Sequence, residues 1–272
     1  DGDPVSASLV DFGLYFHHNA RELMHRGSGP YFHLPKIESH IEARLWNEIF
    51  NFAQDRLGIP RGTIRATVSI ETMSAVFEMD EILFELREHA AGLSTGRRNY
   101  LFSLIKRSLS ANAQKVIFPD RAQLAFGRAM TAPFMRAYAK LLVATCHRRG
   151  AHAIGGDGDM AAFAFSGDPI GAEFGVDQER EVGDGFDGTC VAHPKLVPFA
   201  DEIFTARLGS RPHQKSVEAV DGFTVTSLDL LPSVIEGGEV TDAGVGDNIA
   251  VALRVLSSWL QGKGAVVAHG CS

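Results

Sequence analysis

The sequence predicts an α/β fold, and within that class it favours a (β/α)8 TIM barrel over an open doubly wound sheet. Short apolar runs alternate along the chain with longer segments of helical period, which is the pattern of successive βα units around a parallel sheet. Eight runs can be taken as strands, and the length of 272 residues is one at which such barrels are common. We therefore expect residues 1–272 to form a single barrel domain.

The expected strands are apolar runs bounded by glycine, proline or polar residues. In chain order they are Leu9–Phe16, Tyr31–Pro35, Ile64–Ile70, Gly92–Thr95, Val116–Phe118, Ala151–Ile154, Thr189–Ala192 and Ala265–Ala268.

The expected helices carry recognisable end signals. Glycine follows three of them, at positions 58, 150 and 262, and Thr241 is a candidate N-cap for the last. Proline at position 133 suits the first turn of a helix. Segments 155–159 and 166–181 are expected to be loops. The helices themselves are Glu38–Leu57, Phe77–Glu88, Pro133–Arg149 and Asp242–Gln261.

Composition excludes several classes of function. The net charge of −7 and the pI near 5.9 argue against a nucleic-acid partner, because a duplex-binding surface needs clustered Lys and Arg. No apolar run is long enough to span a membrane, and three widely spaced cysteines suggest a reducing compartment. No G-x-G-x-x-G follows a strand, and no nucleophile elbow or H-E-x-x-H is present, so dinucleotide-binding and common hydrolase classes have no support.

Two oxygen-bearing side chains follow neighbouring expected strands. Glu71 comes directly after Ile64–Ile70, and Asn99 comes shortly after Gly92–Thr95. In a barrel the carboxyl ends of the strands carry the functional groups, and a hard cation such as Mg2+ accepts such donors. The alternative is that Glu71 only caps the following helix together with Thr72.

Further polar residues follow the expected strands at the same edge. Gly96, Arg97 and Arg98 could offer backbone N–H groups and guanidinium charge to a small carboxylate. The alternative is an ordinary turn with exposed arginines. His193 and Pro194 end another strand, where they could equally be a plain strand stop.

Ordered blocks across nearly the whole chain resemble the A-type malate synthases. The match is more specific than any single motif, because the blocks follow one another in the order that this family has. The blocks are Val10–Phe16, Gly27–Phe32, Leu34–Lys36, Glu38–His40, Gly62–Val68, Ile70–Thr72, Phe77–Leu83, Pro133–Tyr138, Cys146–Ala153, Asp187–Thr189 and Val191–Pro194.

The resemblance implies a (β/α)8 barrel, Mg2+ as cofactor, and formation of malate from glyoxylate and acetyl-CoA in the glyoxylate cycle. In this family an Asp removes a proton from the acetyl methyl group and an Arg stabilises the enolate, while Mg2+ polarises the glyoxylate aldehyde. The malyl-CoA thioester is then hydrolysed. The implied location is the cytoplasm, or the peroxisome or glyoxysome in a eukaryote.

Carried over residue by residue, the resemblance gives roles to the residues at the strand ends. Glu71 matches the metal-binding Glu of the family, and Asn99 stands where the family has its metal-binding Asp. Gly96 to Asn99 match the loop that holds glyoxylate, which includes Arg97 and Arg98. His193 and Pro194 match the strand end against the CoA adenine.

The chain departs from the family pattern at the implied metal site. Asn99 offers a carbonyl oxygen without charge, and Arg98 adds a positive charge nearby, so both changes should weaken Mg2+ binding. Asp157 or Asp159, in a stretch that looks inserted, could restore the lost negative charge.

Both ends of the chain look like truncations of a barrel. The chain begins at Asp1 without a methionine, and it ends at Gly270–Ser272 directly after an apolar run. The resemblance places the enolate-stabilising Arg before Asp1 and the general-base Asp after Ser272, in a C-terminal helical domain. It therefore implies that residues 1–272 alone are inactive.

Two other readings stay open. The chain could be a degenerate relative that keeps the barrel as a binding or structural module. It could also belong to a Mg2+-dependent lyase or thioesterase that acts on malyl-CoA or citramalyl-CoA and shares the barrel and the metal chemistry.

Overall fold

The computed structural model describes residues 2, 4–110, 118, 120, 132–156, 171–191, 194–216, 224–231 and 238–264. Its centre is a parallel five-stranded sheet in the order β1-β2-β3-β4-β5, so sequence neighbours are also neighbours in space. The strands are β1 (Tyr31–Leu34), β2 (Arg65–Ile70), β3 (Ala90–Thr95), β4 (His152–Gly156) and β5 (Gly188–Cys190).

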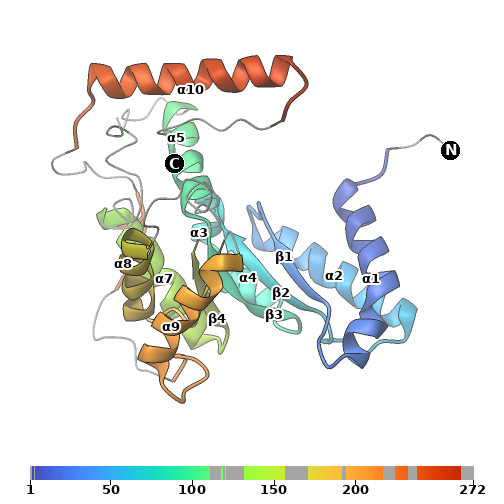
Figure 1. Cartoon of the computed structure of the whole chain (residues 1–272). Coiled ribbons are helices and arrows are strands. Elements are labelled where there is room, and N and C mark those ends of the chain that lie inside the picture. Colours follow the sequence, from blue (N-terminus) through green and yellow to red (C-terminus); the bar gives the residue numbers. More distant parts are fainter. Residues whose placement is uncertain are drawn as a thin grey trace.

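Helices follow the strands and cover the outer side of the sheet (Figure 1). A sheet in which every strand pairs in parallel with the next one along the chain, with helices between them, is half of a curved α/β barrel. The predicted fold class is confirmed. The helices are α1 (Ala7–His25), α2 (His40–Leu57), α3 (Met73–Val76), α4 (Met79–Glu85), α5 (Arg97–Ser110), α7 (Pro133–Arg148), α8 (Gly171–Asp184), α9 (Val197–Leu208) and α10 (Asp242–Leu260), with a 3-10 turn η3 (Pro194–Leu196).

The core lies between the sheet and the helices on its outer face. Alternate residues of β2, namely Ala66, Val68 and Ile70, are fully buried in one apolar cluster with Leu93 of β3 and Leu142 of α7. The other residues of β2 include Thr67 and Ser69, which leads to Glu71. This alternation follows from the two-residue period of a strand, and it directs the polar set toward the inside of the barrel.

Most of the expected elements are confirmed, and their end signals explain why. Gly58 adopts the left-handed conformation with φ of 64° after α2, and Gly150 does so with φ of 70° after α7. Thr241 caps α10 by accepting a hydrogen bond from the N–H of Gly244 at 3.1 Å.

Three expectations were wrong. The expected loop 155–159 is wrong at Gly155 and Gly156, which end β4. Leu9–Phe16 lies in helix α1, where Phe12, Phe16 and Ala20 are buried at a spacing of four residues. A short apolar run cannot by itself distinguish a strand from a helix, and packing against the rings of Phe32 and Phe50 selects the helix. The expected loop 166–181 is wrong over residues 171–181, which belong to α8.

Several boundaries also differ from expectation. The helix expected at Phe77–Glu88 is the shorter α4, and the strand expected at Thr189–Ala192 is β5. Val116 and Ile117 lie outside the described residues, as do Ala265–Ala268, and Phe118 is described without regular structure.

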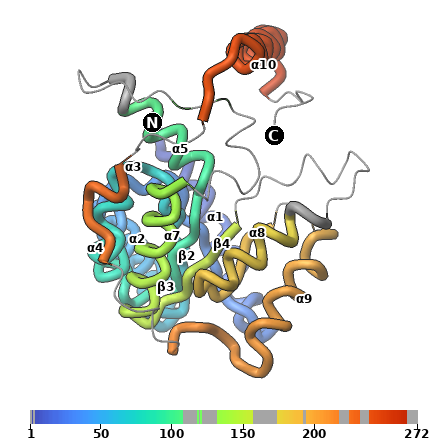
Figure 2. Tube along the Cα trace, turned by 90° about the vertical axis from the view of Figure 1, so that its left-hand side faces the viewer, coloured from blue at the N-terminus to red at the C-terminus, as the bar shows by residue number. Residues whose placement is uncertain are grey.

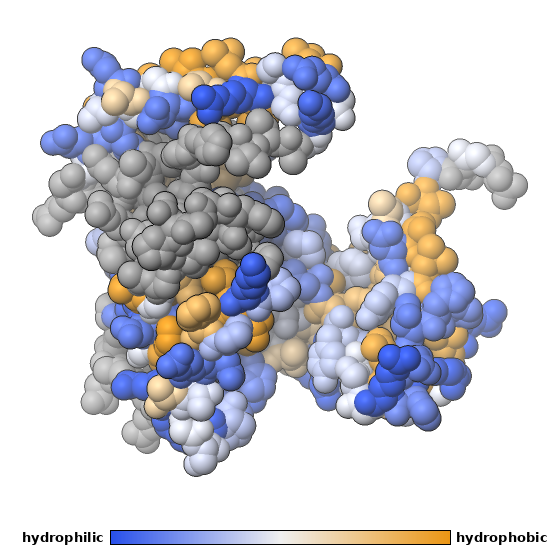
Figure 3. Space-filling view, viewed as in Figure 1, coloured by the Kyte–Doolittle hydropathy of each residue, from blue (hydrophilic) through white to orange (hydrophobic). Residues whose placement is uncertain are grey.

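Helix α10 lies apart from the sheet (Figures 1 and 2), and none of its residues is buried. Its apolar side chains Ile249, Leu253 and Trp259 are exposed, and apolar colour gathers over this helix in the space-filling view (Figure 3). In the part of the chain that the structure describes, no helix is both long and apolar enough to cross a membrane.

Candidate metal and carboxylate site

The candidate site lies at the carboxyl ends of β2 and β3. Ile70 pairs with Thr95, so Glu71 and Gly96 leave the sheet side by side. The approach is close, because a Cβ atom added to Gly96 would lie 2.4 Å from Cβ of Glu71 and 2.9 Å from Oγ of Ser69. Only glycine fits at position 96 without a shift of its neighbours.

The carboxylate of Glu71 is held by donors from two neighbouring elements. Asn99 donates from Nδ2 to Oε2 of Glu71 at 2.6 Å, and the backbone N–H of Lys36 donates to Oε1 at 2.7 Å. The ammonium group of Lys36 lies 3.3 Å from the same Oε1. The side chain of Glu71 is only 6% exposed, so these contacts fix its position.

Glu71 does not cap the following helix. Thr72 takes that role, since its hydroxyl accepts a hydrogen bond from the N–H of Ala75 at 3.3 Å at the start of α3. The same hydroxyl donates to the carbonyl of Ile37 at 2.9 Å. The carboxylate of Glu71 therefore takes no part in capping and faces Lys36 and Asn99 instead.

Lys36 adopts an unusual backbone conformation beside this carboxylate. Its φ of 60° places it in the left-handed region, and among the described residues it is the one residue other than glycine to do so. Such conformations cost about 1 kcal/mol or more and cluster at functional sites. Here the conformation directs both the N–H and the ammonium group of Lys36 toward Glu71.

The donor set fits a magnesium ion as a partial shell. Mg2+ is usually held by one or two carboxylates while waters and substrate oxygens fill its other positions. Glu71 supplies one carboxylate, and the amide of Asn99 can supply an oxygen if it turns. The described residues contain no group of three or more His, Cys, Asp or Glu side chains placed for a metal, and Asp157 and Asp159 lie outside the described residues.

The residues from Gly96 to Asn99 form the start of α5. The first turn is closed by a hydrogen bond from the N–H of Tyr100 to the carbonyl of Gly96 at 2.8 Å. The N–H of Gly96 donates to the hydroxyl of Tyr138 at 3.1 Å, which in turn donates to the carbonyl of Ile70 at 2.5 Å. Helix N-termini favour anions, so the placement suits a small carboxylate next to Glu71 and Asn99.

The guanidinium groups of the two arginines have different environments. Arg97 forms an ion pair with Asp177 of α8 at 2.6 Å, and both side chains are largely buried. Arg98 is exposed in the first turn of α5. Asp177 is not among the site residues expected from the sequence, because its segment is expected there to be a loop.

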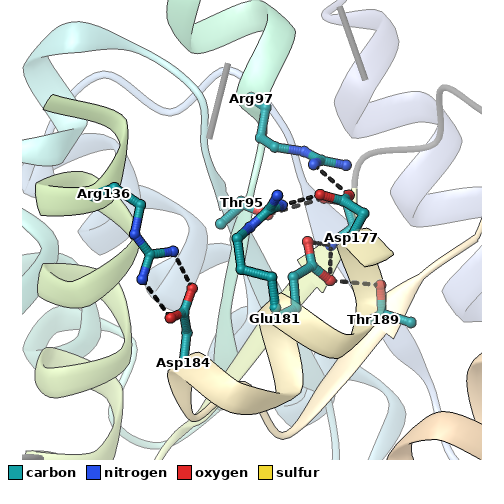
Figure 4. A network of polar contacts seen from close by, with 9 residues as sticks. Thr95, Arg97, Arg136, Asp177, Glu181, Asp184 and Thr189 are labelled. Atoms are coloured by element: carbon teal, nitrogen blue, oxygen red, sulfur yellow. Dashed lines mark hydrogen bonds and ion pairs between the residues drawn. The ribbon is translucent and has the colours of Figure 1, made fainter. Parts of the chain in front are cut away.

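A second buried carboxylate, Glu181, lies close to Arg97 and Asp177 (Figure 4). It accepts from the N–H of Gly156 at 2.8 and 3.0 Å and from the hydroxyl of Thr189 at 3.2 Å. Burial raises the pKa of Glu181, although the nearby charge of Arg97 opposes the shift. The spacing of the acidic residues at 177, 181 and 184 was the one signal in the sequence for a helical face here.

Of the two residues expected beside the CoA adenine, the structure describes Pro194. Pro194 begins η3, four residues after β5 ends at Cys190, and His193 lies outside the described residues.

Comparisons with known proteins agree with the fold. The family model "Malate synthase, TIM barrel domain" matches residues 1–233. The chain is 54% identical to a malate synthase of Streptomyces clavuligerus over 98% of its length and 49% of the relative.

Two further relatives show the same partial coverage. The glyoxysomal malate synthase of Candida tropicalis is 44% identical and covers 98% of the chain and 48% of the relative. Malate synthase A of Escherichia coli (strain K12) is 43% identical, with coverage of 99% and 49%. The chain thus spans about half the length of the curated relatives that it matches.

Proposed function

The chain belongs to the malate synthase family, and we propose that it forms the part of such an enzyme that holds Mg2+ and glyoxylate. The proposed reaction condenses acetyl-CoA with glyoxylate and hydrolyses the malyl-CoA thioester to malate and CoA, as a step of the glyoxylate cycle. We propose that residues 1–272 form one TIM-barrel domain of this enzyme. We place the enzyme in the cytoplasm, or in the peroxisome or glyoxysome of a eukaryote.

The observation that carries this proposal is that the buried carboxylate of Glu71 and the side chain of Asn99 lie together at the carboxyl ends of β2 and β3. These side chains follow neighbouring strands and meet at 2.6 Å, in front of the first turn of α5. A cation and a small carboxylate placed at this edge would touch each other. Glyoxylate joins an aldehyde to a carboxylate, so it can meet both the ion and the helix start at once.

The residues of the chain would divide the work of binding. Glu71 would hold the ion with its buried carboxylate, and Asn99 would add a neutral oxygen. When bound, Mg2+ supplies a Lewis acid that polarises the aldehyde of glyoxylate. The first turn of α5 would orient the carboxylate of the substrate, while Gly96 allows the close approach of the two strand ends.

Other parts of the reaction need groups beyond this site. The methyl group of a thioester is a weak acid, so a base and an enolate-stabilising cation must act together. The resemblance assigns the general-base Asp and the enolate-stabilising Arg to segments outside residues 1–272. We propose that His193 and Pro194 lie against the adenine of CoA.

The test is glyoxylate-dependent release of CoA by the intact protein in the presence of Mg2+. Glu71→Gln should abolish turnover, because it removes the one charged ligand that the described residues offer the ion. Glu85→Gln is the matched control, since Glu85 pairs with Arg44 on the outer helices at 2.8 Å and has no contact with the site. Wild-type protein without glyoxylate-dependent CoA release would refute the proposed reaction.

A second candidate function is a degenerate barrel with a weakened metal site that acts as a binding or structural module. Two contacts favour it: the ammonium group of Lys36 and the amide N–H of Asn99 both face the carboxylate of Glu71, where an ion would lie. Calorimetric titration with Mg2+ and glyoxylate separates the candidates. Binding of Mg2+ in the range usual for metal-dependent enzymes would reject the degenerate site.

A further inference from the structure

Helix α8 presents a stripe of three carboxylates to the rest of the structure. Asp177, Glu181 and Asp184 are spaced by four and three residues, so they share one face of the helix. Each contacts a different element: Arg97 at the start of α5, the ends of β4 and β5, and Arg136 of α7 (Figure 4).

Glu181 fixes α8 to the sheet. Its side chain is nearly inaccessible, and it accepts hydrogen bonds from Gly156 at the end of β4 and from Thr189 in β5. The packing is close, since a Cβ atom added to Gly155 would lie 2.2 Å from Oε2 of Glu181. The position of α8 relative to the carboxyl ends of the strands is therefore tightly defined.

Asp177 lies one turn before Glu181 and contacts Arg97, the residue that follows Gly96 of the candidate site. One of its oxygens lies 2.6 Å from Arg97, and the other is paired with Arg180. The side chains of Arg97 and Asp177 are only 15% and 12% exposed. Breaking a buried pair leaves an uncompensated charge, so this contact strongly resists separation.

Arg97 is joined through the backbone to the groups that form the site. It directly follows Gly96, and it precedes by two residues the Asn99 whose amide reaches Glu71. A shift of Arg97 would move the first turn of α5 together with Asn99. The long arginine side chain has high rotational freedom, which the ion pair removes before any ligand arrives.

We propose that Arg97 is a positioning residue for the glyoxylate site, held by Asp177, and that its guanidinium does not contact the substrate. The inference rests on the proposed function, because it assigns a role within the same site. Glu181 fixes α8 to the strands, Asp177 fixes Arg97 to α8, and Arg97 thereby fixes the first turn of α5. Glyoxylate would then contact the first turn of α5 and not the guanidinium of Arg97.

The alternative role, a direct bond from Arg97 to the substrate carboxylate, gives different mutant behaviour. If Arg97 binds glyoxylate itself, Asp177 competes with the substrate, and Asp177→Asn should leave the KM for glyoxylate unchanged or lower it. If Arg97 acts by positioning, Asp177→Asn and Arg97→Met should each raise the KM for glyoxylate about tenfold. Because they break the same contact, the double variant should be no worse than either single variant.

The experiment is steady-state kinetics of the intact protein, with KM measured for glyoxylate and for acetyl-CoA. Asp184→Asn is the matched control, since it removes the ion pair with Arg136 from the same face of α8 without touching Arg97. We expect Asp177→Asn to change only the KM for glyoxylate, and Asp184→Asn to change neither KM. Thermal unfolding of both variants reports any general loss of stability.

A second variant keeps the proposal testable if Asp177→Asn does not fold. Arg97→Lys retains a charge that can reach Asp177. If Arg97 acts by positioning, the KM of this variant for glyoxylate should stay within about threefold of wild type. If the guanidinium binds glyoxylate directly, the KM should rise as much as in Arg97→Met. Wild-type turnover combined with an unchanged KM in Asp177→Asn would overturn the positioning role alone. Absence of wild-type turnover would overturn the proposed function itself.

Discussion

Restoring a carboxylate at position 99 is the most informative single change at this site. In Asn99→Asp, the amide that donates to Glu71 at 2.6 Å becomes a second acidic group at the same place. Without an ion the two carboxylates repel each other. With an ion bound between them, both attract it.

The magnitude follows from distance and exposure. A unit charge about 4 Å from a cation contributes about 1 kcal/mol at the dielectric of water and about 4 kcal/mol at the value for a protein surface, per unit charge of the ion. Residue 99 is exposed, so the lower end applies, and desolvation reduces it further. We expect a gain of about 1–2 kcal/mol, which corresponds to a Kd for Mg2+ lower by about five- to thirtyfold.

Isothermal titration of Mg2+ into wild type and Asn99→Asp measures this gain. Thermal unfolding adds an independent readout, because loss of the hydrogen bond and repulsion from Glu71 should lower the Tm of the variant when no Mg2+ is present. Addition of Mg2+ should restore it. The control is Glu71→Gln/Asn99→Asp, in which most of the gain in affinity should disappear.

Two results would refute this reasoning. Equal Mg2+ affinity of wild type and Asn99→Asp would mean that position 99 does not face the ion. A gain that persists without the carboxylate of Glu71 would mean that the added charge acts elsewhere.

Three further predictions follow from the contacts around the site and the core. Lys36→Met should tighten Mg2+ binding about threefold in calorimetry, because the ammonium group 3.3 Å from Glu71 competes with the ion, while Lys36→Arg should not. Gly96→Ala should lower the free energy of unfolding by about 2 kcal/mol or more, because its Cβ would overlap Glu71. Gly13→Ala is the control: it lies in α1 with no atom near the added Cβ, and it should raise the free energy of unfolding by up to about 1 kcal/mol. Denaturant unfolding measures both changes. Burial raises the pKa of Asp187, but hydrogen bonds from His147, Ala153 and Gln214 outweigh it and leave the pKa below its ordinary value. A carboxylate whose pKa is lower in the folded state stabilises the fold at pH values above its unfolded-state pKa of about 4, and this stabilisation is lost as the pH falls through the folded-state pKa. Asp187→Asn should therefore destabilise the fold at pH 7 and progressively less toward pH 2, as measured by chemical denaturation.

The local signals in the sequence were enough to locate most of the sheet and the longer helices. Helices α2 and α7 end where glycine adopts a positive φ, and α10 begins at the capping Thr241, so these bounds depend on neighbouring residues alone. The helix α1 was mistaken for a strand because its apolar run has no clear period, and contacts with Phe32 and Phe50 decide its form.

The candidate site also contains one contact that the sequence predicts and one that it does not. Glu71 and Asn99 could be paired from the sequence, because they follow strands expected to be neighbours, and parallel strands end at one edge. The contact between Arg97 and Asp177 could not, since 80 positions separate them and α8 was expected to be a loop. Its acidic residues acquire partners only when the helix packs on the strand ends.

The sequence by itself determined the family, the order of the βα units and the two side chains at the proposed metal site, because these depend on short-range patterns and on the order of blocks along the chain. Only the tertiary structure decided which partners the charged groups have: Lys36 and Asn99 at Glu71, Asp177 at Arg97, and the backbone N–H of Gly156 at Glu181. The reason is physical. A buried charge is stabilised by whichever partner the fold brings within hydrogen-bond distance, and that partner has no fixed separation along the chain.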